Sequence, residues 1–428
     1  MPQSTSPKRR NPKRGHDGPC PVMRSCGGCT WLGLPYRKQL MRKQQEMEEL
    51  FGPVIGRFGW DVAVEPVLGM GPATEDGGPT TVTLADGKLA SPRGFRYKAA
   101  TPFAPGPRGQ VRCGFFARGT HDIVACPTCA VEAPGARELL NEVARMAERL
   151  RIPAYSEDRH TGLLRYAILR CGWRTEERML TLVTSARVVP RLHDLAHALH
   201  KADSRLVSIA QNINPRRTNA ILGGETRTLL GAPHMRDRLL GCTFEISPVS
   251  FYQTNPAQTE VLYRLAIDGM ELRAGDALLD AYCGSGTIGL CATKAAHEAG
   301  ADIHLLGVER NPEGIRDARN NARTNVLEDA SEFVAEDATA YMLKAAAEGR
   351  RVDVLSMDPP RAGSTPEFLE AAAALGPRRI VYISCNPQTQ VRDLEQLGRA
   401  GYRLKRLTPV DMFPHTPHVE TVATLVRG

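Results

Sequence analysis

Apolar residues in the second half of the chain occur as short runs with longer amphipathic stretches between them. The runs lie at residues 277–282, 304–308, 352–357, 380–383 and 421–426, and helix-like stretches separate most of them. Strands that alternate with helices are typical of a doubly wound sheet. The pattern therefore predicts an α/β domain over residues 246–428.

The first half of the chain has a different pattern. Helical stretches are predicted at about 35–50 and 134–150, and short strands at 163–169, 179–183 and 206–212. Residues 65–120 are rich in Gly and Pro, which indicates short strands and loops. We therefore expect a separate α+β domain over residues 20–245. Residues 1–19 have almost no apolar anchor and predict a disordered arm.

Charge is distributed unevenly along the 428 residues, whose net charge is +8. The arm carries +4, residues 20–245 carry +9 and residues 246–428 carry −5. A basic front half predicts binding to a polyanion. We find no apolar run of about 18 residues and no apolar leader, so we expect a cytoplasmic protein without a membrane span. In that setting the 11 cysteines favour metal binding or catalysis over disulfides.

A glycine-rich turn follows the first predicted strand of the α/β domain. It reads Asp280-Ala-Tyr282-Cys-Gly284-Ser-Gly286, and Glu309 closes the next strand. Such a turn lets the backbone approach a ligand, and the acid can accept hydrogen bonds from ribose hydroxyls. These features predict a nucleoside cofactor, either NAD or S-adenosylmethionine.

Two later motifs favour S-adenosylmethionine. Asp358-Pro-Pro-Arg361 ends the strand at 352–357, where methyltransferases that act on nucleobases carry such a motif and dehydrogenases do not. Ser384-Cys385-Asn386-Pro387 ends the next strand. If positive charge or loop amides lowered its pKa, the Cys385 thiolate would be a strong nucleophile; the alternative is a buried structural cysteine.

With these motifs the chain resembles the RNA uracil-5 methyltransferases, which make 5-methyluridine in 23S rRNA and tRNA. The resemblance runs from Cys20 to the C-terminus and includes Phe251–Asn255 and Asp411–Glu420. It implies a Rossmann-like class I methyltransferase domain in a monomeric enzyme, with Cys385 as nucleophile and Glu420 as general base. It also implies that S-adenosylmethionine is bound by Gln253, Tyr282, Glu309 and Asp358, with Asp337 a further candidate near the adenine.

Three cysteines, Cys20, Cys26 and Cys29, lie within ten residues. Clustered cysteines suggest zinc first, but this uneven spacing suits an iron–sulfur cluster better. The family resemblance implies a [4Fe-4S] cluster on these three and on a distant Cys-Pro, which matches Cys126. Cys129 is the competing fourth ligand. A structural role for the cluster is favoured over redox sensing.

Basic and aromatic residues alternate between Ser91 and His121, without an acidic residue. Phosphate contacts and stacking faces suit an unpaired RNA loop, although core aromatics with exposed basic residues would give the same pattern. The residues concerned are Arg93, Arg96, Lys98, Arg108, Arg112 and Arg118, with Phe95, Tyr97, Phe103, Phe115 and Phe116. Arg216 and Arg217 are a second candidate contact.

The chain has 19 residues before Cys20, which matches the family's shorter subtype without an N-terminal barrel domain. That architecture and the start Cys26-Gly-Gly-Cys29-Thr-Trp31 favour 23S rRNA over tRNA as the substrate. Two other functions stay open: a methyltransferase acting on an exocyclic amine, and an RNA-binding iron–sulfur protein with a vestigial methyltransferase fold.

Overall fold

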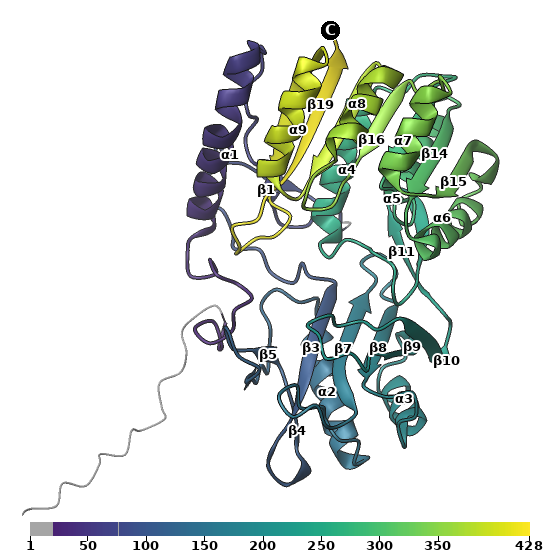
Figure 1. The fold of residues 1–428 in the computed structure, drawn as a ribbon. Coiled ribbons are helices and arrows are strands. Elements are labelled where there is room, and N and C mark those ends of the chain that lie inside the picture. Colours follow the sequence, from purple (N-terminus) through teal and green to yellow (C-terminus); the bar gives the residue numbers. More distant parts are fainter. Residues whose placement is uncertain (1–19, 76) are drawn as a thin grey trace, which may run out of the picture.

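The computed structural model describes residues 20–75 and 77–428, so the predicted basic arm lies outside the described residues. The described chain forms two lobes, one around a seven-stranded sheet and one around a six-stranded sheet (Figure 1). No helix of this described part is long and apolar enough to cross a membrane.

The larger lobe contains the predicted doubly wound sheet, in the order β15-β14-β13-β16-β17-β19-β18. Neighbouring strands run parallel except β19, which is antiparallel to both of its neighbours. The strands are β13 (Ala277–Ala281), β14 (His304–Glu309), β15 (Ser331–Ala335), β16 (Val354–Met357), β17 (Arg379–Ser384), β18 (Tyr402–Val410) and β19 (Glu420–Arg427). The sequence patterns predicted five of these strands and missed β15 and β18.

Both faces of this sheet are covered by helices, which explains the apolar runs. Leu278 and Val354 pack on one face, whereas the adjacent Leu279 and Leu355 pack on the other. The first face is covered by α4 (Pro256–Met270), α5 (Thr287–Glu298) and α6 (Pro312–Thr324). The second is covered by α7 (Ala338–Ala347), α8 (Pro366–Leu375) and α9 (Pro387–Arg399).

The smaller lobe is an α+β unit, as predicted, with the strand order β10-β9-β8-β7-β3-β4. Helices α2 (Ala136–Arg149) and α3 (Leu192–Ala202) pack against this sheet. The strands are β3 (Lys98–Pro105), β4 (Val111–Cys113), β7 (Leu164–Cys171), β8 (Arg178–Thr184), β9 (Leu206–Ile213) and β10 (Glu225–Gly231).

Three two-stranded ribbons complete the strands of the described residues. They are β1 (Gly69–Met70) with β2 (Thr81–Val82), β5 (Phe115–Phe116) with β6 (Ile123–Val124), and β11 (Met235–Leu239) with β12 (Cys242–Ile246). Short 3-10 turns occur at Pro107–Gly109 and Glu328–Ala330.

Helix α1 (Tyr36–Phe58) packs against the larger lobe, although it comes from the front of the chain (Figure 1). Phe51 and Trp60 join the apolar core beneath α8 and α9. The segment after α1 continues along the edge strand β18, with parallel bridges from Val64 to Leu407 and from Leu68 to Val410. The chain therefore starts on the larger lobe, builds the smaller lobe, and then returns.

Candidate active site

The topology of the larger sheet brings the predicted catalytic residues to one edge. Parallel strands end at the same edge of a sheet. Glu309 is the last residue of β14 there, and Tyr282, Asp358 and Cys385 directly follow β13, β16 and β17. Strand β19 is reversed and begins at this edge with Glu420. Because Ser384 pairs with Thr421, Glu420 and Cys385 are the next residues beyond this pair on the two adjacent strands.

The glycine-rich turn after β13 is held by a buried carboxylate. Asp280 Oδ2 accepts a hydrogen bond from the Gly289 amide of α5 at 3.0 Å. Gly286 caps α5 with a φ of 78°, a left-handed conformation that favours glycine. A Cβ on Gly289 would lie 2.7 Å from the Leu305 side chain. These contacts place the N-terminus of α5 against the strand ends, where it can face a ligand.

Glu309 and Asp337 have different surroundings. The Glu309 carboxylate accepts hydrogen bonds from the amides of Gly284, at 3.3 Å, and Asn311, at 2.7 Å. It is therefore fixed beside the glycine-rich turn. Asp337 caps α7 by accepting from the amides of Thr339 and Ala340. This capping role explains the position of the Asp337 carboxylate without a bound ligand.

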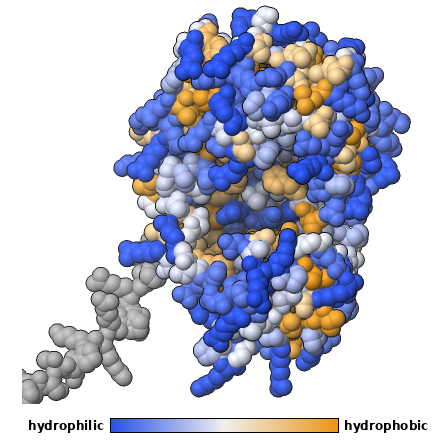
Figure 2. Space-filling view, in the orientation of Figure 1, coloured by the Kyte–Doolittle hydropathy of each residue, from blue (hydrophilic) through white to orange (hydrophobic). Residues whose placement is uncertain are grey.

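A cavity of about 460 Å³ is lined by three of the predicted catalytic and cofactor-binding residues, Cys385, Glu420 and Gln253, and by one predicted cluster ligand, Cys29. Its lining comes from both lobes, and Figure 2 shows a hollow between them on this face of the molecule. The rest of its lining is Gly28, Phe95, Arg96, Lys98, Val131, Phe251, Tyr252, Thr254, Arg361, Phe413, Pro414, Thr416, His418 and Val419. The other predicted cofactor residues do not line this cavity and lie further along the same sheet edge.

Three carboxyl groups with raised pKa values lie at this edge of the sheet. Burial raises the pKa of Glu420 to about 8, and the nearby Asp358 carboxylate adds to this rise. Burial also raises the pKa of Asp358 to about 7, with a contribution from Asp280. The pKa of Asp280 itself rises to about 7 for the same reason of lost hydration. A cation bound here would relieve the repulsion among these groups.

The pKa of Cys385 is raised in the free protein, so the condition stated for an activated thiolate is not fulfilled there. Burial raises the pKa of its thiol, and the charges of Glu420 and Asp358 raise it further. Arg361 opposes this effect and lowers the pKa. No role for Arg361 was predicted from the sequence, although its position directly after Asp358-Pro-Pro indicates that it lies beside the site.

The predicted basic and aromatic residues of the front half separate into two groups. Arg96 and Lys98 line the cavity together with Phe95, and burial lowers the pKa of Lys98 to about 8. In contrast, Phe103 is a core residue and Arg112 donates to the Ile123 carbonyl. Phe95 is also a buried core residue, so the core alternative holds for part of this pattern, and RNA contact by Arg96 and Lys98 stays a prediction.

Five cysteines of the front half, Cys20, Cys26, Cys29, Cys126 and Cys129, lie in one region. The charges of Cys20, Cys26 and Cys129 each influence the pKa of Cys29, and those of Cys20 and Cys129 influence that of Cys126. Among the described residues, however, no three Cys, His, Asp or Glu side chains are arranged to hold a metal ion. The predicted ligands are thus neighbours, without the geometry of a metal site.

Comparisons with known proteins identify the family of the chain. A family model described as tRNA (Uracil-5-)-methyltransferase matches residues 234–427. An uncharacterised RNA methyltransferase of Halalkalibacterium halodurans is 37% identical over 411 residues, which are 96% of this chain and 83% of the relative. One from Lactiplantibacillus plantarum is 36% identical over 99% of this chain and 85% of its own length.

A solved structure is similar along nearly the whole chain. It is the Pyrococcus abyssi tRNA (uracil-54, C5)-methyltransferase in complex with S-adenosyl-L-homocysteine. The TM-score is 0.72 at 27% sequence identity, and the match covers 94% of this chain and 86% of the other. The likeness therefore includes both lobes.

Proposed function

Because this chain belongs to the tRNA (uracil-5-)-methyltransferase family, we propose that it methylates carbon 5 of one specific uridine through a covalent bond from Cys385 to the uracil ring. The fold is that of the class I S-adenosylmethionine-dependent methyltransferases, and the protein is an RNA uracil-5 methyltransferase. The observation that carries the covalent mechanism is the position of Cys385 beside Glu420 in one cavity.

The sheet edge suits S-adenosylmethionine chemically. Its sulfonium is a cation and supplies an electrophilic methyl group, which fits an edge where Asp280, Asp358 and Glu420 have raised pKa values. We propose that Glu309, whose carboxylate is held by two backbone amides, accepts hydrogen bonds from the ribose hydroxyls. Tyr282, Gln253 and Asp358 complete the proposed set. We assign Asp337 only a minor part, since its carboxylate caps α7.

The proposed chemistry uses Cys385 first. Carbon 5 of uracil is a poor nucleophile, so the Cys385 thiolate adds to carbon 6 and converts the ring to an enolate. Carbon 5 then attacks the methyl group and forms a carbon–carbon bond, and S-adenosylhomocysteine leaves. The target base must be unstacked for this attack, so it is flipped out or already unpaired.

Glu420 acts in the last step. Its carboxylate removes the proton from carbon 5, the carbon–hydrogen electron pair forms the carbon 5–carbon 6 double bond, and the Cys385 thiolate leaves. General-base assistance of this kind is typically worth about 100–10,000-fold in rate. Burial of Glu420 raises its pKa to about 8, which makes it a stronger base than a hydrated glutamate.

RNA containing 5-fluorouracil tests the mechanism. Fluorine at carbon 5 cannot be removed as a proton is, so the enzyme should remain attached to this RNA. We expect a band of protein–RNA adduct on a denaturing gel with the wild-type chain and none with Cys385→Ala. A wild-type chain that forms no adduct while it methylates an exocyclic amine would favour the first alternative function. A chain that binds RNA without any methyl transfer would favour the second.

We further propose that residues 20–245, with the arm at 1–19, supply most of the grip on RNA. Arg96 and Lys98, which line the cavity, support the assignment of RNA binding to residues 20–245. Helix α1 is an exception within these residues, because it packs on the catalytic lobe. The proposed substrate is 23S rRNA in the cytoplasm, and tRNA is the second candidate because the P. abyssi protein is named for tRNA. Mass-spectrometric mapping of uridines left unmethylated in a deletion strain decides between them.

A [4Fe-4S] cluster on Cys20, Cys26, Cys29 and Cys126 is the last part of the proposal. The cysteine spacing and the family resemblance support it, together with the proximity of Cys20 and Cys26 to Cys29 and of Cys20 to Cys126. Iron and sulfide analysis of anaerobically purified protein tests it, with Cys126→Ser and Cys129→Ser as a matched pair. We expect only Cys126→Ser to lose iron. Loss with Cys129→Ser alone would reassign the fourth ligand, and protein without iron would refute the cluster.

A further inference from the structure

The loop from Asp411 to Val419 links β18 to β19 and leads directly into Glu420. Phe413, Thr416 and His418 of this β18–β19 loop line the active-site cavity. The loop contains two prolines, and His415 has a left-handed backbone with a φ of 68°. Such an irregular segment depends on contacts from other elements for its position.

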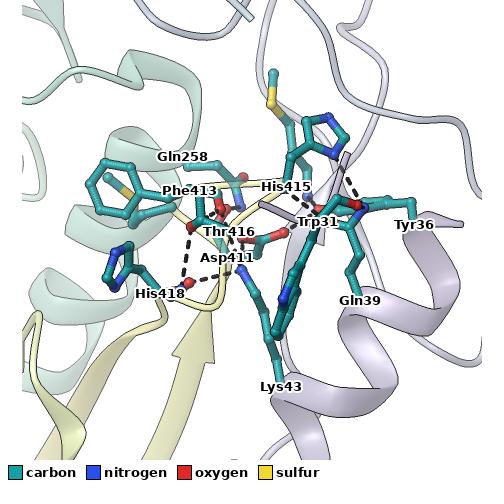
Figure 3. Close-up of polar contacts among 12 residues, drawn as sticks. Trp31, Tyr36, Gln39, Lys43, Gln258, Asp411, Phe413, His415, Thr416 and His418 are labelled. Atoms are coloured by element: carbon teal, nitrogen blue, oxygen red, sulfur yellow. Dashed lines mark hydrogen bonds and ion pairs between the residues drawn. The ribbon is translucent and has the colours of Figure 1, made fainter. Parts of the chain in front are cut away.

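Helix α1 supplies these contacts through one polar stripe. Tyr36, Gln39 and Lys43 are spaced three and four residues apart, which places them on one face of the helix. Their exposed fractions are 3%, 0% and 0%, an unusual degree of burial for polar side chains. Figure 3 shows all three pointing from α1 toward the β18–β19 loop.

Lys43 joins the two ends of the loop. Its ammonium donates to Asp411 Oδ1 at 2.5 Å, where the loop starts, and to the His418 carbonyl at 2.8 Å, two residues before Glu420. Tyr36 donates to the other carboxylate oxygen of Asp411 at 2.7 Å. The ion pair of Lys43 and Asp411 is wholly buried.

Gln39 holds the middle of the loop. Its side-chain carbonyl accepts from the His415 amide at 2.9 Å, and its amide nitrogen lies 3.2 Å from His415 Nδ1. The other ring nitrogen of His415 lies 2.8 Å from the Pro92 carbonyl, and the Trp31 amide donates to the His415 carbonyl at 2.9 Å. The loop is thus fixed at its start, its middle and its end.

A buried ion pair is a costly way to gain stability. Desolvation of the two charges commonly cancels their attraction, so an apolar pair of similar volume would often serve as well. Directional bonds do, however, define one geometry. Their arrangement at both ends of the segment that precedes Glu420 indicates a requirement for position rather than for stability alone.

We propose that Tyr36, Gln39 and Lys43 are positioning residues for the final step of the reaction. By holding the β18–β19 loop, they keep the Glu420 carboxylate directed at carbon 5 of the uracil attached to Cys385. This inference rests on the proposed role of Glu420 as the base. Misplacement of a reacting group by about 1 Å can cost on the order of 100-fold in rate, so loss of the Lys43 bonds should slow release of Cys385.

The double variant Lys43→Met/Asp411→Asn tests the proposal, because it removes both charges and leaves neither buried alone. In single turnovers with unmodified RNA and S-adenosylmethionine, we expect the methylated protein–RNA adduct to persist on denaturing gels. Release of the product RNA should slow at least about 10-fold, whereas the rate of labelled methyl transfer and the Kd for S-adenosylmethionine should change less than about twofold. A variant that was only less stable would lose adduct formation and release together.

Two controls separate the outcomes. Lys344→Met makes the same change at an exposed position of α7, outside the proposed RNA-binding residues, and should behave as the wild type. Glu420→Gln should accumulate adduct, which tests the role of the base itself. If Glu420→Gln accumulates adduct and the folded double variant releases RNA at the wild-type rate, the positioning proposal is wrong. If Glu420→Gln releases RNA normally, the assigned base is wrong instead.

Should the double variant fail to fold, Gln39→Leu provides a second test. It removes the bonds at the middle of the loop and introduces no charge. Circular dichroism establishes that the variant is folded. Slower release with preserved methyl transfer supports the proposal, and wild-type release overturns it.

Discussion

Replacing Glu420 with glutamine should stabilise the protein, and the gain should grow as the pH rises. Glu420 is only 5% exposed, and its burial near Asp358 raises its pKa from 4.5 to about 8. A carboxyl group whose pKa is higher in the folded state contributes stability at low pH. That contribution is lost as the pH rises from 4.5 through about 8. The glutamine side chain does not ionise in this pH range, so it makes no such pH-dependent contribution to stability.

The size of the effect follows from the pKa difference. One pKa unit corresponds to about 1.4 kcal/mol. Relative to a side chain that stays neutral, Glu420 therefore lowers the free energy of unfolding by about 4–5 kcal/mol at pH 8.5 and by only about 1 kcal/mol at pH 5. Urea unfolding at these two pH values, followed by circular dichroism, measures the gap between Glu420→Gln and the wild type. Glu370→Gln, an exposed position on α8, is the matched control and should show almost no gap. A Glu420→Gln protein that is no more stable than the wild type at pH 8.5, or whose advantage does not shrink at pH 5, would refute the reasoning.

Three further changes should have measurable effects. Glu309→Gln should weaken binding of S-adenosylhomocysteine about 10-fold in calorimetry, since one charge-assisted hydrogen bond to the ribose is lost; unchanged affinity would remove Glu309 from the site. Phe51→Ala should lower the unfolding free energy by about 3–5 kcal/mol in urea titrations, because Phe51 is fully buried between α1 and the catalytic lobe, and a loss under 1 kcal/mol would contradict this packing. Gly307→Ala should cost about 1–3 kcal/mol in the same assay, because a Cβ there would lie 2.5 Å from Phe333, and a neutral effect would show that the ring can move.

Most of the catalytic sheet could be predicted from local pattern. Central strands such as β13 and β17 are buried on both faces and therefore appear as continuous apolar runs. Edge strand β18 was missed because Arg403 and Lys405 are exposed and interrupt its apolar positions. The antiparallel direction of β19 brings Glu420 to Cys385. This direction depends on the pairing of β19 with β17 and cannot be predicted from the sequence of either strand.

The buried polar stripe of α1 could not be predicted. By composition, Lys43 in a helix with many charged residues is expected on the solvent side. Its burial depends on Asp411, which is 368 positions away in the chain. The position of the cysteine-rich segment could not be predicted either, because the spacing of the cysteines does not reveal that Cys29 lines the catalytic cavity.

The return of the chain to its starting lobe has a consequence for its synthesis. Helix α1 leaves the ribosome early, but Asp411 and strand β18, against which it packs, are translated near the end. Domains generally fold in the order in which they are made, so the smaller lobe can form first. Until β18 is translated, the apolar and polar faces of α1 that it will bury remain exposed to solvent. A nascent chain halted before β18 should therefore expose α1 to protease or chaperone, and completion of translation should protect it.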